Sequence, residues 1–468
     1  MNTNRLARSH DLVLPDGRPG LPGTLAARAI TEHRAGYAME RSSYMSVGAP
    51  ALIIKARSEQ DVQETVLYAA RLREQSGTRV EFSIRSGGHG IAGTSTNTGG
   101  IILDLSALRH FEMLDPQLGL VRVGAGATWG QIAGQLAAED LVISSGNFGN
   151  TGVGGLATAG GIGYFARSQG LTLDSMVRAK LVTADGTIRW VDTDHEPELF
   201  WAVRGGATHA GVVTAFEFTA TDLRTAAGDA SIIHQQLTYL TDSLPQFTAD
   251  WGQWVRQSPD ELESFLMVQA LGDGQHAIQA RNVWAGDGQD QAAPVLREAL
   301  GLAQLHDSRT ELVPYPMIVP APNSPHAGQQ RIKMRDVLVD QADEQLGDAM
   351  AQSLAHRASL VGELRALGGA VARVPAHATA WGSRHQEVLA ATWIHPLGIA
   401  EQDQSFAALQ VLGTGAYGAY SSDVRRSAAE LAWPGQTGTR LRALSERTDP
   451  QHLFDGGLNL RSQNSSAT

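Results

Sequence analysis

The stretch at positions 80–90 reads VEFSIRSGGHG, in which apolar and polar residues alternate before an arginine, three small residues and one histidine. The alternation from Val80 to Ile84 predicts a short strand. The turn that follows, Arg85 to Gly90, presents consecutive backbone N–H groups, and such a nest can hold a pyrophosphate without any lysine. This stretch alone also allows a simpler interpretation, a tight turn that carries an incidental histidine.

Glycine is concentrated after this strand. The chain has 51 glycines in 468 residues, and they cluster between Gly87 and Gly163. The densest array, at positions 146–163, reads GNFGNTGVGGLATAGGIG. Glycine at this density indicates a backbone packed closely against something flat or anionic.

Helices and strands are predicted on both sides of the glycine array. Ser58 is a good N-cap for a helix that reaches Arg73, with acidic residues in its first turn. A second helix is expected over 129–138, and a hairpin over 180–191 turns at Asp185-Gly186. Further strands are expected at 51–54, 101–105, 120–123 and 214–220. Beyond residue 223 the sequence predicts a helix over 243–256, a hairpin over 267–284 and a strand over 391–395.

Composition excludes several classes of protein. Apolar residues are 42% and charged residues 18%, which is typical of a globular protein. The formal net charge is −11 and no Lys/Arg block stands out, which argues against nucleic acid or an anionic membrane as a partner. With no cysteine, there are no disulfides, thiolate metal sites or thiol-linked cofactors. We see no secretory signal and no membrane-spanning apolar run, so we expect a cytoplasmic protein.

The sequence lacks several common motifs of binding and catalytic sites. Gly124 and Gly126 begin a dinucleotide-like pattern, but the third glycine, Gly130, comes one residue late and deep in the chain. No phosphate-binding P-loop, no serine-hydrolase elbow and no HExxH spacing is present, so no metal site is expected.

Ordered motifs from Pro50 to Asn459 resemble the berberine bridge enzyme-like FAD-linked oxidases of the vanillyl-alcohol oxidase superfamily. The matching pieces, in chain order, are P-A-L-I with D-V at 50–62, R-S-G-G-H at 85–89, G-G-I-I-L-D-L-S at 99–106, G-V-G-G to G-G-I-G at 152–163, G-L-T-L-D at 170–174, P-E-L-F-W-A-V-R-G at 197–205, G-V-V-T at 211–214, A-W-G-S-R at 380–384, and D-P with Phe454 and Asn459. Each piece alone is weak, whereas their joint occurrence in this order is highly specific.

The resemblance implies an α+β fold in two parts. After a lead-in at 1–46, a PCMH-type FAD-binding domain spans 47–222 and is rejoined by a C-terminal segment at 415–468. The inserted residues 223–414 form a substrate domain, an antiparallel sheet covered by helices, one face of which covers the flavin ring.

The resemblance also implies FAD joined to His89 through the flavin 8α-methyl carbon. The diphosphate is expected on Ser86 to Ile91, and residues 152–163 close to the flavin. The cofactor-binding residues implied in this way are Arg85, Ser86, Gly87, Gly88, His89, Gly90, Ile91, Gly152, Gly155, Thr158, Gly160, Gly161, Gly163, Val212 and Asn459. Many members attach FAD by a second bond from a cysteine, and that position is Phe148 here. We therefore expect attachment through His89 only.

Candidate catalytic residues come from the C-terminal half. Relatives carry Y-x-N-Y or Y-x-N-F on a strand that faces the flavin. This chain keeps Tyr417 and Tyr420 but has Ala419 in place of asparagine. Tyr417 is a candidate base or hydrogen-bond partner for a substrate hydroxyl. His395, on the predicted strand 391–395, is another candidate base. Ordinary packing is the alternative for all three side chains.

The resemblance implies an oxidase for a small alcohol, amine or phenolic substrate, acting in secondary metabolism. A base takes a proton from the substrate while hydride passes to flavin N5, and the electrons then go to O2. Two alternatives stay open: a dehydrogenase that uses another electron acceptor, and a protein that binds flavin or a ligand without catalysis. The sequence does not fix the substrate or the oligomeric state.

Overall fold

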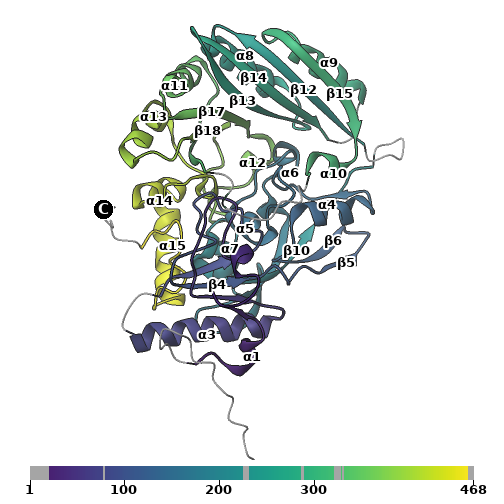
Figure 1. Cartoon of the computed structure of the whole chain (residues 1–468). Helices are drawn as coiled ribbons and strands as arrows, with labels where there is room; N and C mark the ends of the chain where they lie inside the picture. Colours follow the sequence, from purple (N-terminus) through teal and green to yellow (C-terminus); the bar gives the residue numbers. More distant parts are fainter. Residues whose placement is uncertain are drawn as a thin grey trace, which may run out of the picture.

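The computed structural model describes residues 20–76, 80–224, 231–285, 289–320, 328 and 331–461. Figure 1 shows two parts, one above the other. The lower part holds the described residues up to position 222 together with the C-terminal helices. The upper part is a large sheet with helices on its outer side. Among the described residues, no helix is long and apolar enough to cross a membrane.

The RSGGH turn follows a strand of a four-stranded sheet. The strands, in the order β1-β2-β4-β3, are β1 (Ala29–Ile30), β2 (Leu52–Lys55), β4 (Ile101–Asp104) and β3 (Phe82–Arg85). β2 and β3 pair with β4 in parallel. Helix α3 (Glu59–Ser76) joins β2 to β3, and the Ser58 hydroxyl accepts the backbone N–H of Asp61 at 3.1 Å. That bond confirms the predicted N-cap. Short helix α1 (Gly23–Ala26) precedes β1, and α2 (Tyr37–Glu40) lies between β1 and β2.

A five-stranded antiparallel sheet completes the lower part. Its order is β5 (Phe111–Asp115), β6 (Leu120–Gly124), β10 (Val212–Thr219), β8 (Met176–Val182) and β9 (Ile188–Val191). β8 and β9 form the hairpin that the sequence predicts around Asp185-Gly186. Strands β7 (Leu141–Val142) and β11 (Thr221–Asp222) pair separately. The connecting helices are α4 (Trp129–Ala137), α5 (Val153–Ala159), α6 (Ala166–Gln169), η1 (Thr172–Ser175), α7 (Pro197–Val203) and η2 (Ala207–Ala210).

The upper part is a seven-stranded sheet in which all neighbours are antiparallel. Its order is β15 (Gln304–Val313), β12 (Ile232–Thr241), β14 (Gln275–Trp284), β13 (Leu262–Gly272), β17 (Ser359–Ala366), β18 (Val388–Ile394) and β16 (Lys333–Val339). The predicted hairpin is β13–β14. The helices of this part are α8 (Leu244–Gln257), α9 (Gln289–Ala299), α10 (Tyr315–Ile318), α11 (Glu344–Ala355), α12 (Gly369–Arg373) and α13 (Ile399–Leu412).

An apolar core separate from that of the lower part lies between this sheet and its helices. It includes Trp251 and Phe247 from α8, Met350 from α11 and Phe406 from α13, all buried. In Figure 1 these helices cover one side of the sheet, and the other side of β13, β17 and β18 faces the lower part. Side chains alternate between the two faces of a strand, so this sheet can present a second set of residues toward the lower part.

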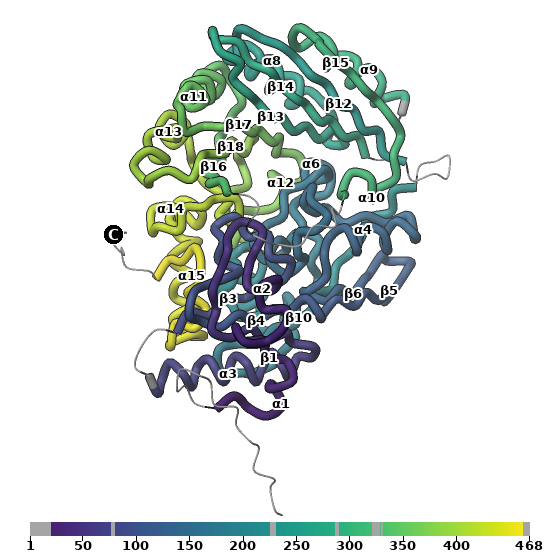
Figure 2. Tube along the Cα trace, viewed as in Figure 1, coloured from purple at the N-terminus to yellow at the C-terminus, as the bar shows by residue number. Residues whose placement is uncertain are grey.

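The chain then returns to the lower part through η3 (Gly418–Tyr420), α14 (Arg426–Ala432) and α15 (Gly435–Thr448). Helix α15 packs against η2 and α7 of the lower part (Figure 2). Leu441, Leu444 and Phe454 are buried in the same apolar core as Leu52 and Ile101. The predicted α+β architecture, with its returning C-terminal segment, is confirmed. The boundaries at 46, 222 and 414 stay predictions.

Candidate functional site

A cavity of about 320 Å³ lies between the two parts. Its lower wall is made by the RSGGH turn, the glycine array and the loops at 205–208 and 456–458. Its upper wall is made by β16, β17, β18 and the turn before α14. The upper side chains are Met334, Arg365, Trp381, Leu389, Trp393, Tyr417 and Tyr420.

The RSGGH turn is fixed from below by Arg85. The Arg85 side chain is buried, and its Nε donates to Asp104 Oδ2 at 2.6 Å. A further guanidinium nitrogen donates to the backbone carbonyl of Glu40 at 2.5 Å. Arg85 does not line the cavity. In this structure Arg85 anchors the turn, and its contact with the cofactor stays a prediction.

Gly87 and Gly152 bring the turn and the start of α5 into backbone contact. A Cβ on Gly87 would lie 2.2 Å from the backbone nitrogen of Gly152. A Cβ on Gly152 would lie 2.0 Å from the backbone nitrogen of Gly87. Neither position has room for a side chain, so the two segments form one continuous floor.

Gly87→Ala is expected to lower the free energy of unfolding by about 1–3 kcal/mol, because the added methyl forces two backbones apart. Thermal unfolding of the purified protein measures this loss. The matched control is Gly155→Ala on the exposed side of α5, where a Cβ meets nothing within 4 Å. That control is expected to keep full stability, since alanine is favoured in helices. Equal midpoints for the two variants would contradict the close contact.

His89 points into the cavity from the end of the turn. Its ring stacks on that of Tyr44, with centroids 4.3 Å apart and an angle of 18° between the planes. The centroid of the Phe148 ring lies 6.4 Å from that of His89. Tyr44 comes from the lead-in, where the sequence carries no motif that signals its role. The histidine is thus oriented by a residue that the sequence did not single out.

The predicted cofactor residues divide into two groups. Those that line the cavity are Ser86, Gly87, Gly88, His89, Gly90, Ile91, Gly152, Gly155 and Thr158. Those that do not are Arg85, Gly160, Gly161, Gly163, Val212 and Asn459. The second group packs against its neighbours. A Cβ on Gly163 would lie 1.3 Å from the Ser145 carbonyl oxygen, and the Asn459 amide donates to Asp455 Oδ1 at 2.9 Å.

Tyr417 faces the glycine array from the upper wall. Its hydroxyl accepts the backbone N–H of Gly161 at 3.0 Å, and its ring makes an edge contact with Trp381 at 4.9 Å between centroids. Burial raises the pKa of Tyr417 to about 12. The residues Gly418–Tyr420 form a single 3₁₀ turn with Tyr417 at its N-cap, which corrects the expectation of a strand. A phenol that is this hard to ionise is a poor base on its own.

Tyr420 belongs to a polar cluster that the sequence did not single out. Its hydroxyl donates to Glu363 Oε2 at 3.0 Å and accepts a hydrogen bond of 2.5 Å from Arg365. The Arg365 guanidinium also pairs with the Glu363 carboxylate and lies 4.8 Å from the centre of the Tyr420 ring. Burial raises the pKa of Tyr420 well above its usual value, and the positive charge of Arg365 opposes the shift.

Glu363 and Arg365 leave a weak signal in the sequence. They sit two residues apart in the otherwise apolar strand β17, so their side chains share one face. Both side chains are buried, and Trp393 of the neighbouring strand donates to Glu363 Oε2 at 3.2 Å. A buried charged pair needs full compensation, which this cluster supplies. Alternating opposite charges within an apolar strand are the pattern that marks such a pair.

His395 does not enter the cavity. It is exposed and follows the last residue of β18, with its backbone N–H bonded to the Ala358 carbonyl at 2.8 Å. Trp393, two residues earlier, is the residue of this strand segment that lines the cavity. We therefore withdraw His395 as a candidate base. No group of three or more potential metal ligands occurs among the residues that the structure describes.

Residues 50–192 match the model of a family described as an FAD binding domain. The chain contains an FAD-binding domain. The matched region includes the RSGGH turn and the glycine array, which line the lower wall of the cavity. This match and the shared fold below confirm the resemblance to berberine bridge enzyme-like FAD-linked oxidases.

Proteins similar to this flavoprotein carry oxidase and oxidoreductase names. (R)-6-hydroxynicotine oxidase of Paenarthrobacter nicotinovorans is 38% identical over 168 residues, which is 36% of this chain and 35% of that protein. An uncharacterised FAD-linked oxidoreductase of Bacillus subtilis is 27% identical over 424 residues, 86% of this chain and 90% of that protein. The match to this hydroxynicotine oxidase and those to two FAD-dependent monooxygenases, of Cochliobolus heterostrophus and Aspergillus calidoustus, span only 31% to 46% of the relatives' own lengths.

Solved structures share the fold across nearly the whole flavoprotein. 6-Hydroxy-D-nicotine oxidase from Arthrobacter nicotinovorans superposes with a TM-score of 0.78 at 23% identity, covering 93% of this chain and 98% of that one. Glucooligosaccharide oxidase from Acremonium strictum superposes with a TM-score of 0.78 at 21% identity, covering 93% of this chain and 97% of that one. The description of the latter names a 6-S-cysteinyl, 8α-N1-histidyl FAD.

Proposed function

We propose that this chain is an FAD-dependent oxidase that takes a hydride from a small alcohol, amine or phenolic substrate. The observation that carries the proposal is the arrangement of the cavity. His89 and the glycine floor line one wall, and the cluster of Tyr420, Arg365 and Glu363 stands on the opposite wall. Relatives with names such as 6-hydroxynicotine oxidase and FAD-dependent monooxygenase support a role in the conversion of small secondary metabolites.

The lower wall fits FAD. The floor is bare backbone at Gly87 and Gly152, where a Cβ would collide, and open at Gly155, where a Cβ would meet nothing within 4 Å. Successive N–H groups of the turn suit a diphosphate. His89 is the residue that would carry the covalent bond, and because the chain has no cysteine it would be the single attachment. Phe148 occupies the position of the second bond and lies against His89.

FAD, when bound, supplies the hydride acceptor and passes the electrons on to O2. The residues of this chain handle the proton. The substrate hydroxyl or amine gives its proton to the Tyr420 oxygen while the Tyr420 proton moves to Glu363 Oε2, along the 3.0 Å hydrogen bond. Arg365 steadies the charge on the phenol oxygen throughout. This relay favours Tyr420 over Tyr417, whose hydroxyl accepts from the Gly161 amide and whose backbone N–H binds Asp336.

A substrate screen with two stages tests the proposed activity. The purified flavoprotein is mixed without oxygen with panels of alcohols, amines, sugars and phenols, and bleaching of the flavin absorbance is recorded. We expect at least one class to bleach the flavin, and air to restore the colour within the turnover time. Very slow reoxidation in air would instead support the dehydrogenase alternative. A failure of every class to bleach the flavin would support a non-catalytic protein.

A further inference from the structure

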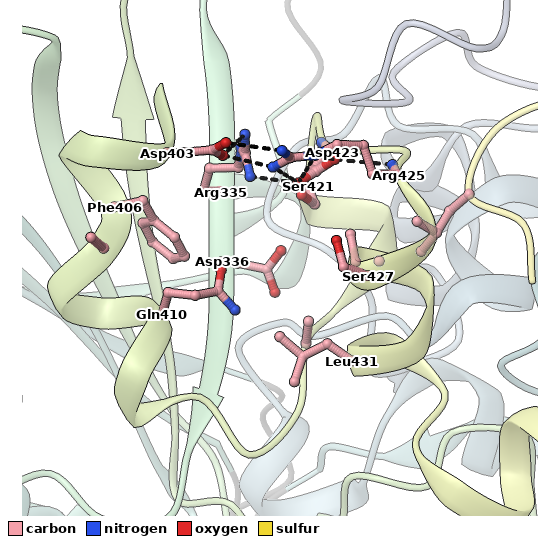
Figure 3. Close-up of a pocket in the computed structure, with 15 residues that line it drawn as sticks. Arg335, Asp336, Asp403, Phe406, Gln410, Ser421, Asp423, Arg425, Ser427 and Leu431 are labelled. Carbon is pink, nitrogen blue, oxygen red and sulfur yellow. Dashed lines mark hydrogen bonds and ion pairs between the residues drawn. The ribbon is translucent and has the colours of Figure 1, made fainter. Parts of the chain in front are cut away.

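A second cavity, of about 400 Å³, lies behind the turn that carries Tyr417 and Tyr420. Figure 3 shows it between α13, β16 and the start of α14. Its mouth is formed by exposed residues, Ala407 and Gln410 on α13 and Ser427 on α14. Its volume is in the range of small-molecule sites. Ala416, Gly418 and Leu458 line both cavities, so this pocket touches the back of the upper wall.

A closed ion-pair network borders one end of the pocket. Arg335 of β16 pairs with Asp403 at 2.9 Å and with Asp423 at 2.5 Å. Arg425 pairs with the same two carboxylates, at 2.6 and 2.7 Å. These four residues balance one another in charge. Both guanidinium groups pair with these two carboxylates and neither forms an ion pair with Asp336, while Arg335 Nε has no hydrogen-bond partner among the described residues.

Asp336 is the acid that the network leaves uncompensated. Its side chain is buried, and Oδ2 accepts the backbone N–H of Tyr417 at 2.6 Å. Oδ1 has no hydrogen-bond partner among the described residues. Figure 3 shows this carboxyl reaching into the space between Phe406 and Gln410 on one side and Ser427 and Leu431 on the other. A buried acceptor without a donor is costly unless a ligand supplies one.

We propose that this second cavity binds a small organic cation, a primary amine with an apolar body. The ammonium donates to Asp336 Oδ1 and restores neutrality to a pocket whose five charged side chains sum to −1. The apolar body packs against Phe406 and Leu431, and the Phe406 ring adds a favourable surface for a cation. Since Asp336 also holds the Tyr417 backbone, occupancy of this site stiffens the turn that presents both tyrosines to the first cavity.

Calorimetric titration of the holoprotein with benzylamine at pH 8 tests the site. We expect saturable binding, and we expect benzyl alcohol, which has the same shape without the charge, to bind at least about tenfold more weakly. Asp336→Asn is expected to weaken the binding of benzylamine by a similar factor, while the amide oxygen of the new asparagine side chain can still accept the Tyr417 N–H. Absence of saturable benzylamine binding by the unaltered protein would overturn the proposal.

The Ala407→Trp variant distinguishes benzylamine binding in this pocket from binding in the first cavity. Ala407 lies at the exposed mouth, so an indole there closes the entrance without entering a core. We expect this variant to lose benzylamine binding while its flavin content and flavin bleaching stay unchanged. Benzylamine binding that survives in Ala407→Trp would place the amine elsewhere and overturn the proposal, even if Asp336→Asn fails to fold. This outcome is independent of whether the first cavity is that of an oxidase.

The binding should also follow the ionisation of Asp336. Burial raises the pKa of this carboxyl to about 7, against the lowering effects of the Tyr417 amide and of Arg335. The other charged groups around the pocket are Asp403, Asp423 and Arg425, which stay paired at neutral pH. The anion that attracts the amine is therefore present above pH 7 and lost below it. We expect benzylamine to bind up to about tenfold more weakly at pH 6 than at pH 8, and a flat profile would contradict the assignment.

Discussion

Acid precipitation of the His89→Ala protein is expected to leave a colourless pellet, whereas the unaltered protein leaves a yellow one. A covalently attached flavin stays with the denatured chain, and a flavin held only by contacts washes away once the fold is lost. His89 points into the cavity beside the glycine floor, and its ring is held against Tyr44 at 4.3 Å between centroids. With no cysteine in the chain, removing this histidine removes the proposed attachment entirely.

The matched control is His395→Ala, which removes an exposed histidine outside the cavity and should leave the pellet yellow. Absorbance of the supernatant gives the complementary reading, since FAD released from His89→Ala appears there. We also expect slower substrate oxidation by any flavin that His89→Ala retains, because alkylation at the 8α position raises the reduction potential. A colourless pellet from the unaltered protein would refute covalent attachment while leaving FAD binding itself in place.

Tyr420→Phe is expected to slow flavin reduction by about 10²–10⁴-fold, the range typical of a lost proton-transfer residue. The substitution keeps the ring above Arg365 and removes only the hydroxyl that bridges the substrate to Glu363. Glu363→Gln should give a loss of similar size, because the relay then has no acceptor. Anaerobic stopped-flow reduction with a substrate found in the screen measures both.

Tyr417→Phe serves as the control for the aromatic wall. Its hydroxyl accepts from the Gly161 amide, so its loss disturbs packing without removing the relay. We expect a smaller decrease in reduction rate than for Tyr420→Phe, with flavin content unchanged. A larger decrease for Tyr417→Phe would assign the base to Tyr417 and contradict the role of the Glu363 cluster. Effects of Tyr420→Phe and Glu363→Gln that multiply in the double variant would contradict a single shared relay.

The lower wall could be predicted from the sequence because the motifs that indicate it are local. A strand that ends in small residues predicts a turn with free backbone N–H groups, and the structure places that turn, from Ser86 to Ile91, on the cavity. Gly160, Gly161 and Gly163 do not line the cavity, and a Cβ at these positions would meet Trp381, Thr172 and the Ser145 carbonyl. Sequence shows that a glycine is needed, and only packing shows what it must accommodate.

The residues of the upper wall could hardly be predicted from the sequence. Glu363 and Arg365 reach Tyr420 across more than fifty residues of chain, and Tyr44 reaches His89 from the lead-in. His395 was predicted from its place on a strand, yet β18 ends one residue before it and Trp393 takes the position on the cavity. Asp336 gave no signal, because an acid on strand β16 gains meaning only from the turn packed against it.

The sequence by itself determined the RSGGH turn, the need for glycine in the array and the absence of any thiol attachment. These follow from backbone conformation and residue chemistry over short stretches, whereas the α+β class was implied by the ordered motifs along the whole chain. The tertiary structure alone decided which charged groups meet at Tyr420 and which acid stays uncompensated behind it. The reason is physical: a buried charge is stabilised or left uncompensated by partners that only long-range packing brings within hydrogen-bond distance.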